Sequence, residues 1–192
     1  MIRSTAAAAL ALGIAVAAPL PAQADPGLSL KPQAGQFVGE DFKRVGAGQA
    51  AQAKWTTKEA RSGSHSVLLQ KSVATTTPAF AAAVVKGAEG MTVEEVGTIG
   101  FSVQGPCTGG SPRFNLSYDT DNDGDADGIA FYGCGNHVTG AEDGWTTMAV
   151  EAASMAPADA DVTSLSVLVD EQGTYFVDDV EVAGETLSGP SD

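Results

Sequence analysis

Short runs in which hydrophobic and polar side chains alternate recur along most of the chain. In the clearest run, Ile99, Phe101 and Val103 alternate with small or polar residues. A period of two places successive side chains on opposite faces of an extended strand, so each run predicts a β-strand with one buried face. Gly, Pro and Asp residues separate the runs and indicate turns. The predicted strands lie at residues 67–69, 80–85, 98–103, 113–118, 129–131, 147–150, 164–169 and 175–182.

Helical patterns are rare by comparison. Residues 149–160 are rich in alanine, but Pro157 interrupts them, and no apolar stripe recurs every 3.6 positions. About eight to ten short strands in about 150 residues are typical of two packed sheets, each of which buries its hydrophobic face against the other. The pattern therefore predicts an all-β fold, a two-sheet β-sandwich or jelly roll.

The N-terminus has the three parts of a cleaved secretory signal peptide. Arg3 provides the positive charge, residues 6–18 are apolar, and residues 22–24 fit the small-x-small cleavage pattern. The apolar run is too short to cross about 30 Å of hydrocarbon comfortably, which disfavours a membrane anchor. We therefore expect residues 1–24 to be removed and the protein to be secreted and extracellular. The rest of the chain is predicted to form a loose leader over residues 25–35, the sandwich over 36–184 and a flexible tail over 185–192.

The charge of the chain narrows the class of partner. The 192 residues include 24 Asp and Glu but only 10 Lys and Arg, which gives a formal net charge of −14. Such a chain repels the phosphates of nucleic acid and the headgroups of an anionic membrane. We therefore expect neither as a partner. The length suits one domain, which we expect to be a monomer.

The two cysteines, Cys107 and Cys134, are predicted to form a disulfide. An exported chain meets an oxidising environment, and two cysteines allow a single pairing. A bridge that closes a loop of this size stabilises a fold by roughly 3–4 kcal/mol on the chain-entropy model. The bridge would hold the open end of a hairpin formed by residues 113–118 and 129–134.

An acidic segment lies at the tip of the same predicted hairpin. Its alternate aspartates turn carboxylates toward one point, and Gly124 permits the tight bend that follows. Hard oxygen ligands at this spacing are those that calcium prefers. The segment resembles the D-x-D-x-D-G-x-x-D calcium loops of integrin-like hairpins, and the alternative is a solvated acidic tip. The predicted calcium ligands are Asp119, Asp121, Asp123, Asp125 through its backbone carbonyl, and Asp127.

Four further segments, in order from about residue 40 to 183, resemble a carbohydrate-binding-module jelly roll of the galactose-binding-like group. They are Asp41-Phe42 followed by Trp55, the Ser-Gly-x-x-Ser entry at residues 62–69, Gly144-Trp145, and residues 175–180 with their Asp-Asp pair. The resemblance implies a jelly roll that binds polysaccharide. It also implies a structural calcium shared by an early Glu and a late Asp. Here the early position is Lys43, and Asp178 and Asp179 are the candidates for this second metal site.

A sugar-binding surface needs exposed aromatic rings beside polar side chains. The chain has two Trp and three Tyr. Trp55 and Trp145 are expected in the core, whereas Tyr132 has the parity opposite to Ile129 and Phe131 and is the candidate ligand-binding ring. Sugar binding predicts that at least two of the five Trp and Tyr side chains are exposed together on one face.

The sequence nominates no catalytic set. His65 and His137 lie in turn-like segments, no nucleophile elbow is present, and no carboxylate pair stands out among the 24 acids. The first hypothesis is therefore a secreted, non-catalytic calcium-binding module whose partner is an extracellular polysaccharide. The second is an extracellular structural or protein-interaction domain in which calcium is purely structural. A small secreted hydrolase is a distant third.

Overall fold

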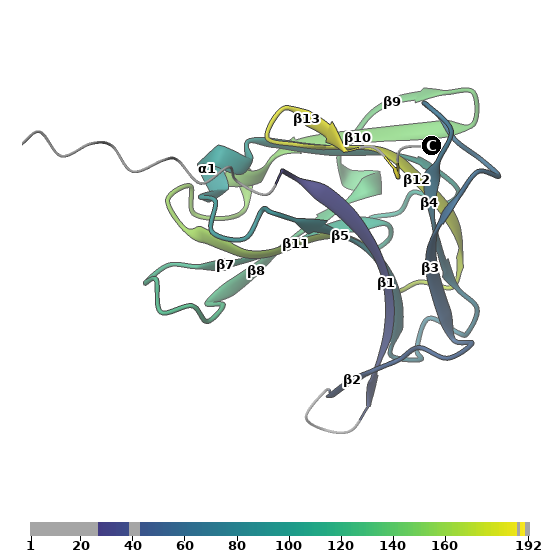
Figure 1. Cartoon of the computed structure of the whole chain (residues 1–192), viewed down its shortest axis with the longest axis horizontal. Coiled ribbons are helices and arrows are strands. Elements are labelled where there is room, and N and C mark those ends of the chain that lie inside the picture. The colour runs from purple at the N-terminus through teal and green to yellow at the C-terminus, as the bar shows by residue number, and fades with distance from the viewer. Residues whose placement is uncertain (1–26, 39–42, 188, 191–192) are drawn as a thin grey trace, which may run out of the picture.

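The computed structural model describes residues 27–38, 43–187 and 189–190. Two antiparallel sheets stack face to face, with β9, β10, β12 and β13 in the layer above β5, β11, β7 and β8 (Figure 1). The predicted β-sandwich is thus confirmed. The predicted signal peptide lies outside the described residues. Within the described part, no helix is long and apolar enough to cross a membrane.

The first sheet has the strand order β2-β1-β5-β11-β7-β8, and every pairing is antiparallel. Its strands are β1 (Ser29–Val38), β2 (Lys43–Val45), β5 (Ala79–Lys86), β7 (Arg113–Asp119), β8 (Gly128–Gly133) and β11 (Asp161–Val169). β8 is an edge strand of this sheet, so one of its sides pairs with no described strand.

The second sheet has the order β3-β4-β12-β6-β10-β9, with β13 paired to β12. Its strands are β3 (Ala51–Thr56), β4 (Ser66–Lys71), β6 (Thr98–Gln104), β9 (Val138–Glu142), β10 (Trp145–Glu151), β12 (Gly173–Val182) and β13 (Glu185–Leu187). The short helix α1 (Val93–Val96) and single 3-10 turns at Cys134–Asn136 and Ala152–Ser154 complete the described elements. The alanine-rich stretch after residue 149 therefore finishes a strand and forms no long helix.

The core lies between the sheets. Phe101 of β6 and Phe114 of β7 meet across it with ring centroids 5.3 Å apart. Small side chains of β5, among them Ala81 and Ala83, are fully buried in the same core. Large and small residues thus interdigitate, as dense packing requires.

Both predicted limits of the sandwich are corrected. Residues 29–36, most of which were expected in a loose leader, pair with β5 from Ser29↔Lys86 to Gln36↔Ala79. Pro32 fits in β1 because this part of the strand has an open edge. β2 pairs only with residues 36–38, so on the side of β1 away from β5 Pro32 has no strand partner that needs an amide donor. At the other end, residues 185–187 form β13, so the predicted tail begins with a paired strand.

Candidate functional site

The hairpin of β7 and β8 carries most of the candidate site. Its register pairs Phe114 with Tyr132 and Tyr118 with Gly128. The predicted disulfide between Cys107 and Cys134 is confirmed and holds the open end of the hairpin. The acidic segment forms the tip, where the amide of Asp127 donates to the carbonyl of Tyr118 at 2.9 Å.

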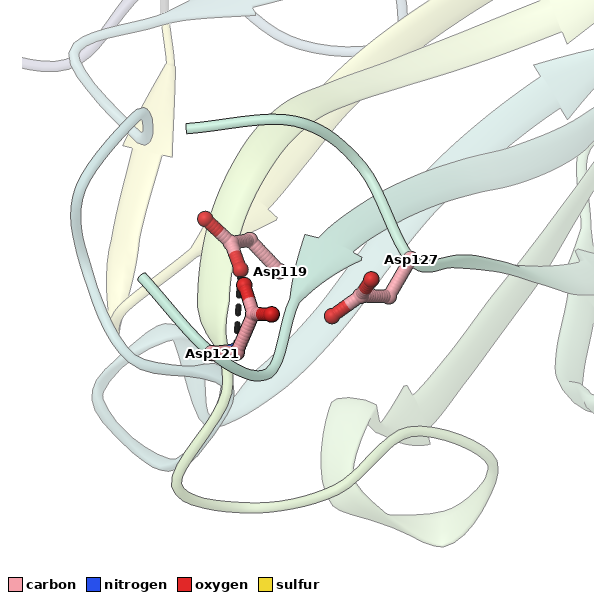
Figure 2. A group of neighbouring side chains, drawn as sticks. All are labelled: Asp119, Asp121 and Asp127. Atoms are coloured by element: carbon pink, nitrogen blue, oxygen red, sulfur yellow. Dashed lines mark hydrogen bonds between the residues drawn. The ribbon is translucent and has the colours of Figure 1, made fainter. Parts of the chain in front are cut away.

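Asp119, the last residue of β7, organises the acidic loop (Figure 2). Its side chain is nearly buried and accepts three backbone amides. Oδ1 accepts those of Asp121 at 3.0 Å and Asn122 at 2.9 Å, and Oδ2 accepts that of Gly124 at 2.8 Å. Gly124 has a φ of 90°, a left-handed conformation that glycine adopts without strain. These amides, led by that of Gly124, outweigh the opposing effect of burial and lower the pKa of Asp119.

Three of the five predicted ligands lie together. Carboxylate oxygens of Asp119, Asp121 and Asp127 are all within 4.8 Å of one another. Asp127 is held from the side by Thr120, whose hydroxyl and backbone amide both donate to Oδ2, the amide at 2.7 Å. These bonds, the hydroxyl's first, lower the pKa of the Asp127 carboxyl.

The carboxylates of Asp123 and Asp125 do not belong to this cluster, and the predicted role of the Asp125 backbone carbonyl stays a prediction. The carboxylate of Asp123 accepts the backbone amide of Asp125 at 2.8 Å, and both side chains are exposed. Asp123 therefore closes a local turn. The spacing of the acids predicted where the loop lies, but it did not identify which carboxylates converge.

Tyr132 is not the exposed ring that the sequence analysis expected. It is fully buried, and its hydroxyl donates to the carbonyl of Ala152. Burial raises the pKa of Tyr132 to about 12. The predicted alternation is present, but the buried and exposed faces are the reverse of those expected. Ile129 and Phe131 face solvent and are 47% and 46% exposed. One feature of the sequence does indicate the correct face. Cys134, a predicted disulfide partner, lies two residues after Tyr132 and therefore on the same face of the strand.

The five Trp and Tyr side chains do not form an exposed platform. Trp145, Tyr132 and Tyr175 are buried, and Trp55 and Tyr118 are half-buried. Trp55 lies on β3 and Tyr118 on β7, which belong to different sheets. The expected test for sugar stacking therefore fails for these five residues.

Phe131, which the sequence analysis placed in the core, instead begins a row of side chains across the outer face of the first sheet. The strand registers align it with one residue on each of the next four strands. Neighbouring strands are about 4.8 Å apart, so the row spans about 19 Å. In order from β8 to β1, its members are Phe131, Asn115, Ser166, Val84 and Lys31.

Asp178 and Asp179, the candidates for a second metal, lie on β12 and contact the segment between β3 and β4. Oδ2 of Asp178 accepts the backbone amides of Arg61 and Ser62 at 2.7 and 3.0 Å. Asp179 forms an ion pair with Arg61, with Nη1 3.1 Å from Oδ2. The sequence analysis did not single out Arg61.

Comparisons with known proteins agree with this architecture. No protein-family profile matches the chain, and no curated protein matches its sequence. Among solved structures, a family 30 carbohydrate-binding module superimposes with a TM-score of 0.56 at 11% identity, over 87% of this chain and 91% of that one. The family 30 module of a cellulosomal cellulase of Clostridium thermocellum gives 0.51 at 13% identity, over 80% and 91%. The protein therefore has the β-sandwich fold of carbohydrate-binding modules.

Proposed function

We propose that this protein is a secreted, non-catalytic binding module for an extracellular polysaccharide, and that the polysaccharide lies on the outer face of the first sheet around Phe131. The observation that carries the proposal is the exposed Phe131 ring at the end of a row that crosses five strands. The similar fold of the family 30 modules supports it.

The chemistry of this face suits a sugar. An exposed aromatic ring stacks on the apolar face of a pyranose, and neighbouring amide and hydroxyl groups bind its hydroxyls. Asn115 and Ser166 follow Phe131 in the row, and Ser117 lies beside Asn115 on the same face of β7. The polar groups nearest Phe131, on Asn115 and Ser166, are uncharged, and the charged member of the row, Lys31, lies at its far end, so the face around the ring favours a neutral chain.

We further propose that the acidic loop binds calcium. The donor set fits this ion, because Asp119, Asp121 and Asp127 offer hard carboxylate oxygens within 4.8 Å of one another. Without a cation, three converging negative charges repel one another. The loop leads directly into β8, so the ion would fix the start of the strand that carries Phe131.

An extracellular protein-interaction domain is the second candidate. It is favoured by the buried and scattered Trp and Tyr side chains, which leave one strongly exposed aromatic ring among the described residues. Ile129 beside Phe131 on the edge strand would then serve as part of an apolar contact with a protein.

Electrophoresis in native gels cast with a neutral β-glucan, a xylan or a mannan tests the proposal. We expect at least one polymer to retard the wild-type protein, and Phe131→Ala to abolish that retardation. Met155→Ala is the matched control, because Met155 is 53% exposed but lies outside the row. If no polymer retards the wild-type protein, the polysaccharide proposal fails and the protein-interaction candidate replaces it.

A further inference from the structure

Two consecutive aspartates of β12 face the same segment, which a regular strand does not allow. Successive side chains of a strand point to opposite faces. Here the pairing of β12 with β6 shifts register between Asp178 and Glu181, and Asp179 has a φ of 47°. An irregularity of this kind re-aims a side chain, so both carboxylates turn toward Arg61 and Ser62.

The chain's own donors reach every oxygen of the two carboxylates. Oδ1 of Asp178 accepts the amide of Asp179 at 2.8 Å, and its Oδ2 accepts the amides of Arg61 and Ser62. Oδ1 of Asp179 accepts the hydroxyl of Ser62, and its Oδ2 accepts Nη1 of Arg61 at 3.1 Å. The same Nη1 donates to Ser102, which is fully buried on β6. Arg61 is thus held against two strands of the second sheet.

This donor set does not fit a metal ion. Calcium takes six to eight oxygen ligands, but among the described residues no third acidic, His or Cys side chain joins Asp178 and Asp179 at metal-binding distance. A cation placed beside Arg61 would also meet its positive charge. The structural calcium that the family resemblance implies at Asp178 and Asp179 is therefore not supported here.

We infer that Arg61 takes the place of a structural metal at this position. Its guanidinium offsets one of the two negative charges of the aspartate pair and ties the segment between β3 and β4 to β12 without any ion. Arginine suits this role because it stays charged and donates in fixed directions. The inference is independent of polysaccharide binding, since it concerns the opposite sheet from Phe131.

The test uses a background in which Asp121→Asn and Asp127→Asn remove two of the three converging carboxylates of the acidic loop, so that calcium binding at the loop interferes little. The full chain in this background is melted in chelator and in millimolar calcium. We expect the same melting temperature in both. A calcium-dependent rise that Asp179→Asn removes would show a metal at this site and overturn the inference.

Variants of Arg61 in the same background complete the test. Lys54→Met is the matched control, because it removes an exposed cation. Arg61→Met is expected to lower the melting temperature by about 2–4 °C more than Lys54→Met does. For a domain of this size, that difference corresponds to about 1 kcal/mol of unfolding free energy. Arg61→Lys keeps the charge and should lose less. Calcium should partly restore Arg61→Met, because the aspartate pair then lacks a cation.

Two results at Arg61 would overturn the inference. One is an Arg61→Met variant as stable as Lys54→Met. The other is a loss of stability that calcium does not reverse, which would make Arg61 a hydrogen-bonding anchor only. If Arg61→Met does not fold, its refolding in millimolar calcium decides between these results, and Arg61→Lys supplies the stability comparison.

Discussion

The guanidinium of Arg113 lies over the ring of Phe131, with its Cζ atom 5.4 Å from the ring centroid. The guanidinium is itself fixed, because Nη1 and Nη2 each donate to an oxygen of Asp170 at 2.7 Å, and Nε donates to Asn115 at 2.9 Å. The exposed ring of the proposed binding face is therefore supported by a cation that Asp170 holds in one orientation.

Replacing Arg113 should weaken both the fold and the binding face. Arg113→Met removes a bidentate pair and a cation–π contact, and because Asp170 is 41% exposed, the loss in unfolding free energy should be about 1 kcal/mol. Urea denaturation of Arg113→Met, Asp170→Asn and the double variant measures the coupling. Additive effects of the two single changes would show that the pair contributes nothing.

The Asp170 carboxylate also predicts a dependence on acid. Burial raises the pKa of Asp170, but the hydrogen bonds and charge of Arg113 outweigh burial and lower it from the ordinary value of 3.8. A carboxyl whose pKa is lower in the folded state stabilises the fold above its unfolded pKa, and this stability is lost as the pH falls below about 3.8. The stability difference between wild type and Asp170→Asn should therefore shrink between pH 5 and pH 3. A constant difference would contradict the assignment.

Tyr132 should matter for stability and not for ligand binding. Tyr132→Phe leaves the carbonyl of Ala152 without its hydroxyl donor, at a cost of about 1–2 kcal/mol in unfolding free energy. Retardation by the polysaccharide should stay unchanged in Tyr132→Phe.

Tyr132 also predicts a dependence on alkali. Because its pKa is raised from 10.0 to about 12, Tyr132 should contribute stability that is lost as the pH rises through that range. Denaturation of wild type and Tyr132→Phe from pH 8 to 11 measures this, and a smaller wild-type loss would contradict it.

The β7–β8 hairpin shows what the sequence could and could not predict. Alternation at residues 129–131 predicted the strand, because a period of two is a property of the backbone. It could not identify the buried face, because both faces carry an aromatic residue. Phe131 is the more hydrophobic ring, but Tyr132 is the one whose hydroxyl finds a buried acceptor. That acceptor, Ala152, is 20 residues away, and no local pattern indicates it.

The limits of the sandwich and the Arg61 contacts were missed for the same reason. Residues 29–36 contain Pro32 and Gly35, which are typical of a loop, yet β5 offers them a complete strand partner. Arg61 and Asp179 are 118 positions apart and meet only through the irregularity in β12. Partners distant in sequence are set by the tertiary fold, which local propensity does not contain.

Lys71 is a buried charge that the fold needs. It is 1% exposed, and its Nζ donates to the carbonyls of Thr75, Thr77 and Asp170 at 2.9, 2.5 and 2.7 Å. Lys71→Met keeps the apolar stem but leaves three carbonyls unpaired, so we expect a loss of about 2–4 kcal/mol in unfolding free energy. Lys54→Met, on the exposed face of β3, should cost far less. Equal losses in urea denaturation would contradict the role given to Lys71.

The acidic loop predicts a calcium-dependent melting temperature. An ion that binds only the folded state adds about 2.7 kcal/mol at a concentration of 100 times Kd, which is about 5–10 °C for a domain of this size. Differential scanning fluorimetry of chelator-treated protein in rising calcium measures the shift.

Asp121→Asn should reduce the calcium-dependent shift most cleanly. Asp121 is exposed and belongs to the converging set, whereas Asp119 also holds three backbone amides. Asp125→Asn, an exposed acid outside that set, should retain most of the shift. A melting temperature that millimolar calcium leaves unchanged would remove the calcium proposal, and equal effects of the two variants would mean that calcium is attracted only by the general acidity of the loop.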